Sequence, residues 1–139
     1  MESFMEKARS LVMYHEGLEL FPYKDAVGKT TIGYGRNLSD RGVSPDEAEY
    51  LLENDLRIAL IDAQALLGAH WDGLSDNRKA VLVDMALNLG KPRLAAFVEF
   101  LEALKAGDYE RAADEMMDSL WARQVRRRAV ALTKIIREG

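Results

Sequence analysis

The sequence predicts a mostly helical α+β fold with two lobes. A small antiparallel sheet lies in the N-terminal lobe, and a long helix connects it to a helical C-terminal lobe. Three observations indicate this. A glycine-rich segment of strand-forming residues follows one amphipathic helix near the N-terminus. Apolar residues then recur at helical spacing from about residue 45 to 67. From Ser75 onward the same spacing continues to the C-terminus.

Length and composition indicate one domain with a sizeable core, because the chain has 139 residues of which 48% are hydrophobic. It contains no cysteine, which excludes disulfides and thiolate chemistry. The net charge of −4 argues against generic nucleic-acid binding. We see neither a signal peptide nor an apolar run of about 18 residues, so we expect no membrane insertion. The basic residues gathered over 123–137 indicate either a surface for a polyanion or a solvated helix face.

The first helix is predicted over residues 4–16, where apolar side chains recur at helical spacing. Ser3 and Glu6 form a capping box before it, and Gly17 is suited to end it. Glu16 then lies at the negative end of the helix dipole, where a carboxylate is disfavoured. This unfavourable position indicates that Glu16 serves chemistry.

The next segment, from Leu20 to about Leu38, changes from helical to strand-like composition. Turn-forming residues begin at Asp25, and Thr31 lies in a run that favours a strand. We predict two or three short antiparallel strands, which must lean on helices because such a sheet is marginal alone.

A second capping box, Ser44 with Glu47, opens the long helix predicted over about 45–67. A helix of that length spans about 30 Å, enough to connect two lobes. Beyond it, Asp108 should cap a shorter helix, and a last helix should cover about 123–137.

These elements predict a single domain over residues 1–139. Its small lobe covers about 15–45, and its helical lobe covers about 70–139 together with the helix 4–16. A cleft between the lobes is a natural place for a ligand.

Several kinds of site are excluded. Gly28, Lys29 and Thr30 match the end of a phosphate-binding loop, but Tyr23 stands where its first glycine should be. His15 and His70 are the only histidines and form no zinc motif. We therefore expect no metal and no cofactor. A pair of carboxylates, Glu16 and Asp25, remains, and two carboxylates across a groove are the minimum for cleaving a glycosidic bond.

The order of residues in this segment resembles the phage-type lysozymes, glycoside hydrolase family 24. The family pattern E-G-x-x-x-x-x-Y-x-D-x-x-G-x-x-T-I-G-x-G is met at nine positions: Glu16, Gly17, Tyr23, Asp25, Gly28, Thr31, Ile32, Gly33 and Gly35. The resemblance continues along the chain at Asn88, Gly90, Trp121, Gln124 and Arg128. The chain departs from it in a shorter segment between Leu38 and Ser44, and in Arg36 where a histidine is usual. We expect Arg36 to pair with Asp55.

The resemblance implies a lysozyme-like fold and an endolysin that hydrolyses the β-1,4 bond between N-acetylmuramic acid and N-acetylglucosamine in bacterial peptidoglycan, usually with inversion. Glu16 is then the general acid, Asp25 activates a water, and Thr31 helps to hold that water. Arg128 is expected to reach Glu16. Four residues, Arg128 among them, are expected to bind substrate or support the cleft: Tyr23, Asn88, Trp121 and Arg128. The resemblance also implies storage in the cytoplasm until release to the wall. No feature of the sequence argues for an oligomer, so we expect a monomer.

Three alternatives stay open. A lytic transglycosylase usually manages with one glutamate, so Asp25 and Thr31 disfavour it. A catalytically silent wall-binding module is disfavoured because Glu16 and Asp25 are both present. An enzyme of similar fold that acts on chitin differs only in its sugar contacts.

Overall fold

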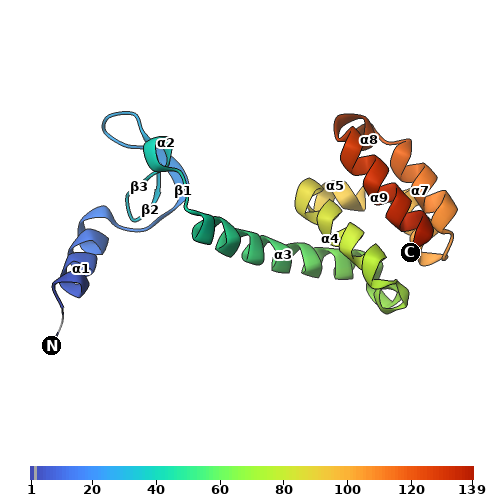
Figure 1. Cartoon of the computed structure of the whole chain (residues 1–139), viewed down its shortest axis with the longest axis horizontal. Helices are drawn as coiled ribbons and strands as arrows, with labels where there is room; N and C mark the ends of the chain where they lie inside the picture. Colours follow the sequence, from blue (N-terminus) through green and yellow to red (C-terminus); the bar gives the residue numbers. More distant parts are fainter. Residues whose placement is uncertain (2) are drawn as a thin grey trace. The chain divides into compact units, whose positions relative to one another are not determined.

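A computed structural model describes Met1 and residues 3–139 of the chain. It confirms a mostly helical α+β fold with a small antiparallel sheet near the N-terminus (Figure 1). The chain divides into two compact units, Met1–Tyr50 and Leu51–Gly139, and the boundary lies inside helix α3. The prediction of one domain, with the helix 4–16 belonging to the helical lobe, stays a prediction.

The N-terminal unit holds the sheet and its helices: α1 (Phe4–Glu16), β1 (Glu19–Lys24), β2 (Thr30–Gly33), β3 (Arg36–Asn37), α2 (Leu38–Arg41) and the first turns of α3 (Pro45–Leu67). The C-terminal unit holds the rest of α3 and the remaining helices: η1 (Gly68–Gly73), α4 (Asp76–Leu89), α5 (Lys91–Ala95), α6 (Val98–Lys105), α7 (Tyr109–Met117), α8 (Leu120–Gln124) and α9 (Arg126–Glu138).

Helix α1 begins at the predicted capping box. The Ser3 hydroxyl accepts a hydrogen bond from the Glu6 amide at 3.2 Å, and the Ser3 amide donates to the Glu6 carboxylate at 3.0 Å. Gly17 ends the helix with φ 69°, and its amide donates to the Met13 carbonyl. These bonds satisfy backbone groups that a helix end leaves without partners, and they place Glu16 at the last residue of the helix.

The sheet has the order β1-β2-β3 with both pairs antiparallel. Tyr23 lies opposite Thr31, and Thr31 lies opposite Asn37. Since residues directly opposite each other point to the same face of a sheet, these three side chains form one row across the strands. Thr31, in the middle of the row, is 4% exposed.

The second predicted capping box is also present. The Ser44 hydroxyl accepts from the Glu47 amide at 3.2 Å, and the Ser44 amide donates to Glu47 Oε1 at 2.8 Å. The expected pairing of Arg36 with Asp55 is wrong. Both Nη atoms of Arg36 contact Glu47 instead, at 2.7 and 2.6 Å. Asp55 lies roughly two turns beyond Glu47 along α3. The capping box holds the Glu47 carboxylate at the start of the helix, where Arg36 contacts it.

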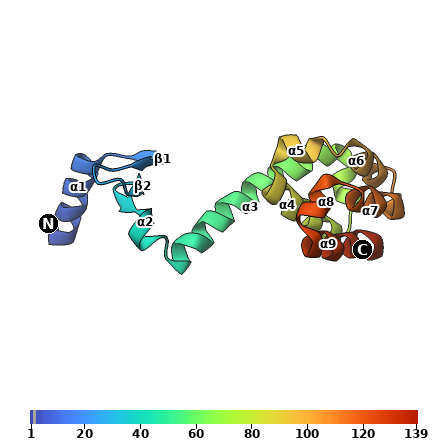
Figure 2. The same ribbon diagram turned by 90° about the horizontal axis from the view of Figure 1, so that it is seen from above.

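The core of the C-terminal unit lies among α4, α6, α7 and α9. In Figures 1 and 2, α7 and α9 lie side by side, in agreement with their contacts. Arg78 of α4 joins both of them, because its Nε donates to the Ile136 carbonyl at 2.8 Å and its guanidinium lies 3.4 Å from the centroid of the Tyr109 ring. One apolar face of α4 is buried in this core: Val81, Leu82, Met85, Ala86 and Leu89.

The boundary of the last helix differs from the prediction. It begins at Arg126 and not near residue 123, because Val125, with φ −117° and ψ 30°, interrupts the helix. A separate short helix, α8, precedes it and is capped by Ser119. Along the residues described, no helix has both the length and the apolar composition that crossing a bilayer requires.

Candidate active site

A concavity in the N-terminal unit brings together four of the predicted site residues. Its volume is about 250 Å³, and it is lined by residues of α1, the sheet and the turns between the strands: Glu16, Tyr23, Asp25, Ala26, Val27, Thr31, Gly35 and Asn37. All of these belong to one compact unit. Two carboxylates and a hydroxyl therefore converge on one solvent-filled space.

Glu16 enters this concavity from the end of α1, where Gly17 turns the chain away from the helix. Its carboxyl group lies against the backbone of Gly35, since a Cβ atom at position 35 would be only 3.0 Å from Glu16 Cδ. Within the N-terminal unit, no described residue forms a hydrogen bond or ion pair with the Glu16 side chain. Glu16 is exposed, and within this unit its carboxyl group lies against Gly35 and is free to bond to a ligand.

Asp25 is fixed by the turn that joins β1 to β2. Its Oδ1 accepts hydrogen bonds from the amides of Val27 at 3.0 Å and Lys29 at 2.8 Å. Its own amide donates to the Lys29 carbonyl at 2.9 Å, and its carbonyl accepts from Gly28 at 3.0 Å. Bonds from amides to a carboxylate are strengthened by its negative charge. The turn occupies Oδ1, and no described residue bonds to Oδ2.

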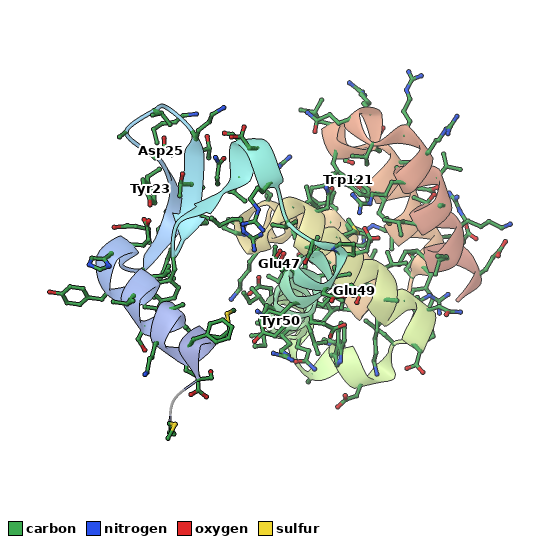
Figure 3. All side chains as sticks on the ribbon, turned by 60° about the vertical axis from the view of Figure 1, so that its left-hand side comes forward. Tyr23, Asp25, Glu47, Glu49, Tyr50 and Trp121 are labelled. Atoms are coloured by element: carbon green, nitrogen blue, oxygen red, sulfur yellow. The ribbon has the colours of Figure 1, made fainter. Side chains whose placement is uncertain are left out.

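Thr31 is joined to Asp25 through the backbone of Lys29. The Thr31 hydroxyl donates to the Lys29 carbonyl at 3.1 Å, the same oxygen that accepts from the Asp25 amide. Because a hydroxyl has one hydrogen and two lone pairs, Thr31 can still accept a hydrogen bond. Figure 3 shows Tyr23 and Asp25 where β1 leads into this turn.

The remaining predicted residues belong to the C-terminal unit. Trp121 is 3% exposed, and its Nε1 donates to Asn88 Oδ1 at 2.7 Å. Arg128 Nε lies 3.0 Å from Oδ1 of Asp84, a residue that the sequence analysis did not single out. That oxygen is buried and has no hydrogen-bond partner among the described groups, so the contact is an ion pair without a directed bond. The contact of Arg128 with Glu16 stays a prediction.

The strand beside the concavity is anchored to α3 by charge. The Arg36 guanidinium, together with the Ser44 amide and hydroxyl, lowers the pKa of Glu47 to about 2. Arg36 also donates to the Gly42 carbonyl at 3.1 Å. Since Arg36 directly follows Gly35, this bidentate pair holds the backbone on which Glu16 rests.

Sequence reasoning assigned no role to three residues that line the concavity: Ala26, Val27 and Asn37. It also missed the close approach of Gly35 to Glu16 and the hydrogen bonds of the Lys29 backbone to Asp25 and Thr31. Gly35 was a fixed position of the family pattern, which is the one signal that could have drawn attention to it. Within the described residues, no cluster of three or more histidine or acidic side chains could hold a metal ion.

Comparisons with known proteins bear on this geometry. A model of the family described as phage lysozyme matches residues 13–135. The chain is similar to the pre-baseplate central spike protein Gp5 of Enterobacteria phage T4, with 30% identity over an alignment of 151 residues that covers 89% of this chain and 26% of that protein. It thus spans about a quarter of that relative's length. It is also similar to two proteins of Dictyostelium discoideum described as probable T4-type lysozymes 1 and 2, each with 24% identity and 94% of both chains covered.

Proposed function

Because this chain belongs to the phage lysozyme family and so to the glycoside hydrolases, we propose that it is a muramidase. It hydrolyses the β-1,4 bond between N-acetylmuramic acid and N-acetylglucosamine in bacterial peptidoglycan by general acid/base catalysis, and so lyses cells. One observation carries the proposal. Glu16, Asp25 and Thr31, which come from three different elements or turns, line one concavity of the N-terminal unit.

Glu16 acts as the general acid. Breaking a glycosidic bond leaves an alkoxide, which departs readily only if it receives a proton as the bond breaks. Within the N-terminal unit the Glu16 carboxyl group has no bond to another described side chain, so nothing in this unit competes with the leaving oxygen for its proton. Because the carboxyl group lies against the Gly35 backbone, the contact restricts the positions from which it can donate that proton.

Asp25 and Thr31 act together on a water molecule. The turn uses Asp25 Oδ1, and the Thr31 hydrogen bonds to the Lys29 carbonyl, so the free acceptors are Asp25 Oδ2 and the Thr31 lone pairs. A water that donates one hydrogen to each of them presents its own lone pair to the anomeric carbon. As the carbon–oxygen bond forms, the proton passes to Asp25, while the carboxylate stabilises the oxocarbenium-like transition state.

The other predicted residues bind the sugar or support the surrounding structure. Tyr23 lines the concavity and lies opposite Thr31, so we assign it a contact with the sugar. Trp121 and Asn88 support the C-terminal unit through their hydrogen bond. Arg128 is assigned a supporting role. The enzyme works as a monomer without a cofactor, and it stays in the cytoplasm until it is released to the wall.

Product analysis tests this function. Purified peptidoglycan is digested, the fragments are reduced with borohydride, and the reduced sugar is identified by mass spectrometry. A muramidase leaves a reducing N-acetylmuramic acid, which becomes its alcohol. Reduced glucosamine at the new ends would place the cut at the other bond. A 1,6-anhydro end would identify a lytic transglycosylase. Binding to peptidoglycan without release of fragments would identify a catalytically silent wall-binding module. Cleavage of chitin but not of peptidoglycan would identify a chitin-directed enzyme.

A further inference from the structure

We propose that Gly35 is a positioning residue for Glu16. Its bare backbone holds the Glu16 carboxyl group at the one place in the concavity from which the proton reaches the glycosidic oxygen. The inference rests on the proposed function, since it assigns a role toward the general acid of that reaction.

The contact between the two residues is unusually close for any side chain at position 35. A Cβ atom there would lie 3.0 Å from Glu16 Cδ, 3.1 Å from Cγ and 3.1 Å from Oε2. Carbon atoms in contact normally lie about 3.5–4.0 Å apart. The space between the Gly35 backbone and the carboxyl group has room for a hydrogen atom only. The backbone of Gly35 therefore contacts the Glu16 carboxyl group directly, and we call this contact surface the wall.

This closeness separates Gly35 from the other glycines of the same unit. Gly35 has φ 82°, which L-residues other than glycine rarely adopt, and this alone favours glycine there. Gly17, Gly28, Gly33 and Gly42 also have positive φ, but a Cβ on any of them meets no described atom within 4 Å. Backbone conformation explains all five glycines, whereas contact with a site residue is found at Gly35.

The surroundings of Glu16 make this wall necessary. Within the N-terminal unit, no described residue holds the carboxyl group by a hydrogen bond or ion pair, so its position within this unit depends on van der Waals contact with its neighbours. Gly35 is itself held, because Arg36 directly after it is tied to Glu47 by two contacts. A methyl group at position 35 must therefore move Glu16 and not the strand.

The experiment compares Gly35→Ala with Gly33→Ala, which carries similar backbone strain at φ 69° but adds its methyl to open space. Each variant is assayed on purified peptidoglycan and on a dinitrophenyl glycoside of the peptidoglycan disaccharide. Dinitrophenolate leaves without a proton, so this second substrate does not need the general acid. Circular dichroism and the melting temperature report folding for both variants.

We expect Gly35→Ala to lower kcat on peptidoglycan about 10-fold with KM little changed, because the added methyl must push the Glu16 carboxyl group aside by a few tenths of an ångström and a misplacement of about 1 Å can cost about 100-fold. On the dinitrophenyl glycoside the loss should be less than about threefold, because no proton is donated. Gly33→Ala should lower the melting temperature by a similar amount and lose no more on one substrate than on the other. Gly35→Asn serves if the alanine variant does not fold, since asparagine tolerates positive φ but carries the same Cβ.

Equal losses on both substrates, or equal losses for Gly33→Ala and Gly35→Ala, would overturn the role of Gly35. The proposed function is tested separately by Glu16→Gln in the same assays. If Glu16→Gln remains active on peptidoglycan, the general acid itself is wrongly assigned. If it is inactive there while Gly35→Ala behaves as Gly33→Ala does, the positioning role alone fails.

Discussion

The Lys29 amide donates a 2.8 Å hydrogen bond to Asp25 Oδ1, and the Lys29 carbonyl accepts a 2.9 Å bond from the Asp25 amide. The same carbonyl accepts the Thr31 hydroxyl at 3.1 Å. One backbone residue thus fixes both groups proposed to hold the nucleophilic water. Its side chain is not involved, because Lys29 Nζ pairs with Asp40 at the surface.

Lys29→Pro should therefore impair catalysis although no catalytic side chain is changed. Proline removes the amide that bonds to Asp25, and a lost hydrogen bond to a charged group costs about 1.5–3 kcal/mol. Lys29→Ala is the matched control, since it removes only an exposed ion pair worth about 0–1 kcal/mol. Turnover on peptidoglycan is measured for both after circular dichroism confirms folding. Equal activity of the two variants would show that the backbone of Lys29 does not orient Asp25.

Thr31→Val should lose activity and stability together. Valine has nearly the same shape but no hydroxyl, so the water loses an acceptor and the Lys29 carbonyl loses one of its donors. The Lys29 carbonyl keeps its bond from the Asp25 amide, so the loss of one hydrogen bond should cost about 0.5–1.5 kcal/mol in the free energy of unfolding. Thr31→Ser keeps the hydroxyl and should retain most of the turnover, at a stability cost of about 1 kcal/mol for the missing methyl group. If Thr31→Val turned over as fast as Thr31→Ser, Thr31 would have no part in holding the water.

The stability of the chain should depend on Glu47 at acidic pH. Its pKa is lowered to about 2 in the folded chain by Arg36 and Ser44, whereas an unfolded glutamate has a pKa of about 4.3. The unfolded state therefore takes up the proton first, so the stabilisation is complete above about pH 5 and is lost as the pH falls toward 2. Chemical unfolding of the wild type and Glu47→Gln is compared across that range. The difference between them should shrink as the pH falls; a constant difference would contradict the role of this ion pair.

Asn88→Ala should destabilise the C-terminal unit without changing its chemistry. It leaves the buried indole N–H of Trp121 without its 2.7 Å partner, at a cost of about 1–3 kcal/mol. Asn88→Asp still offers an oxygen to the indole and should be less destabilised. Thermal unfolding measures both variants. Equal melting temperatures for the two would mean that the hydrogen bond contributes little to stability.

The parts of the fold that could be predicted are those set by neighbours in sequence. The capping boxes at Ser3 and Ser44 and the cap at Asp108 each span only four successive residues, and all three are present. The row of Tyr23 and Thr31 follows from the antiparallel pairing of two strands joined by a short turn.

What could not be predicted depends on how the backbone folds in space. Arg36 was expected to reach Asp55, but Glu47 is presented to it by the capping box of α3. The Lys29 backbone donates to Asp25 and accepts from Thr31. Both bonds involve backbone atoms, so the identity of residue 29 does not indicate them. Gly35 shows its glycine requirement in sequence, but its contact with Glu16 arises only when the end of α1 meets the turn between β2 and β3.

The central claim is that Glu16 supplies the proton for cleavage of the glycosidic bond, and the most direct measurement is the release of reducing ends from purified peptidoglycan by Glu16→Gln. Glu19→Gln, a matched change on the neighbouring strand, is the control. We expect Glu16→Gln to keep the wild-type circular dichroism spectrum and to lose at least about 100-fold in rate, while Glu19→Gln remains active. A folded Glu16→Gln variant that releases reducing ends at the wild-type rate would contradict the account.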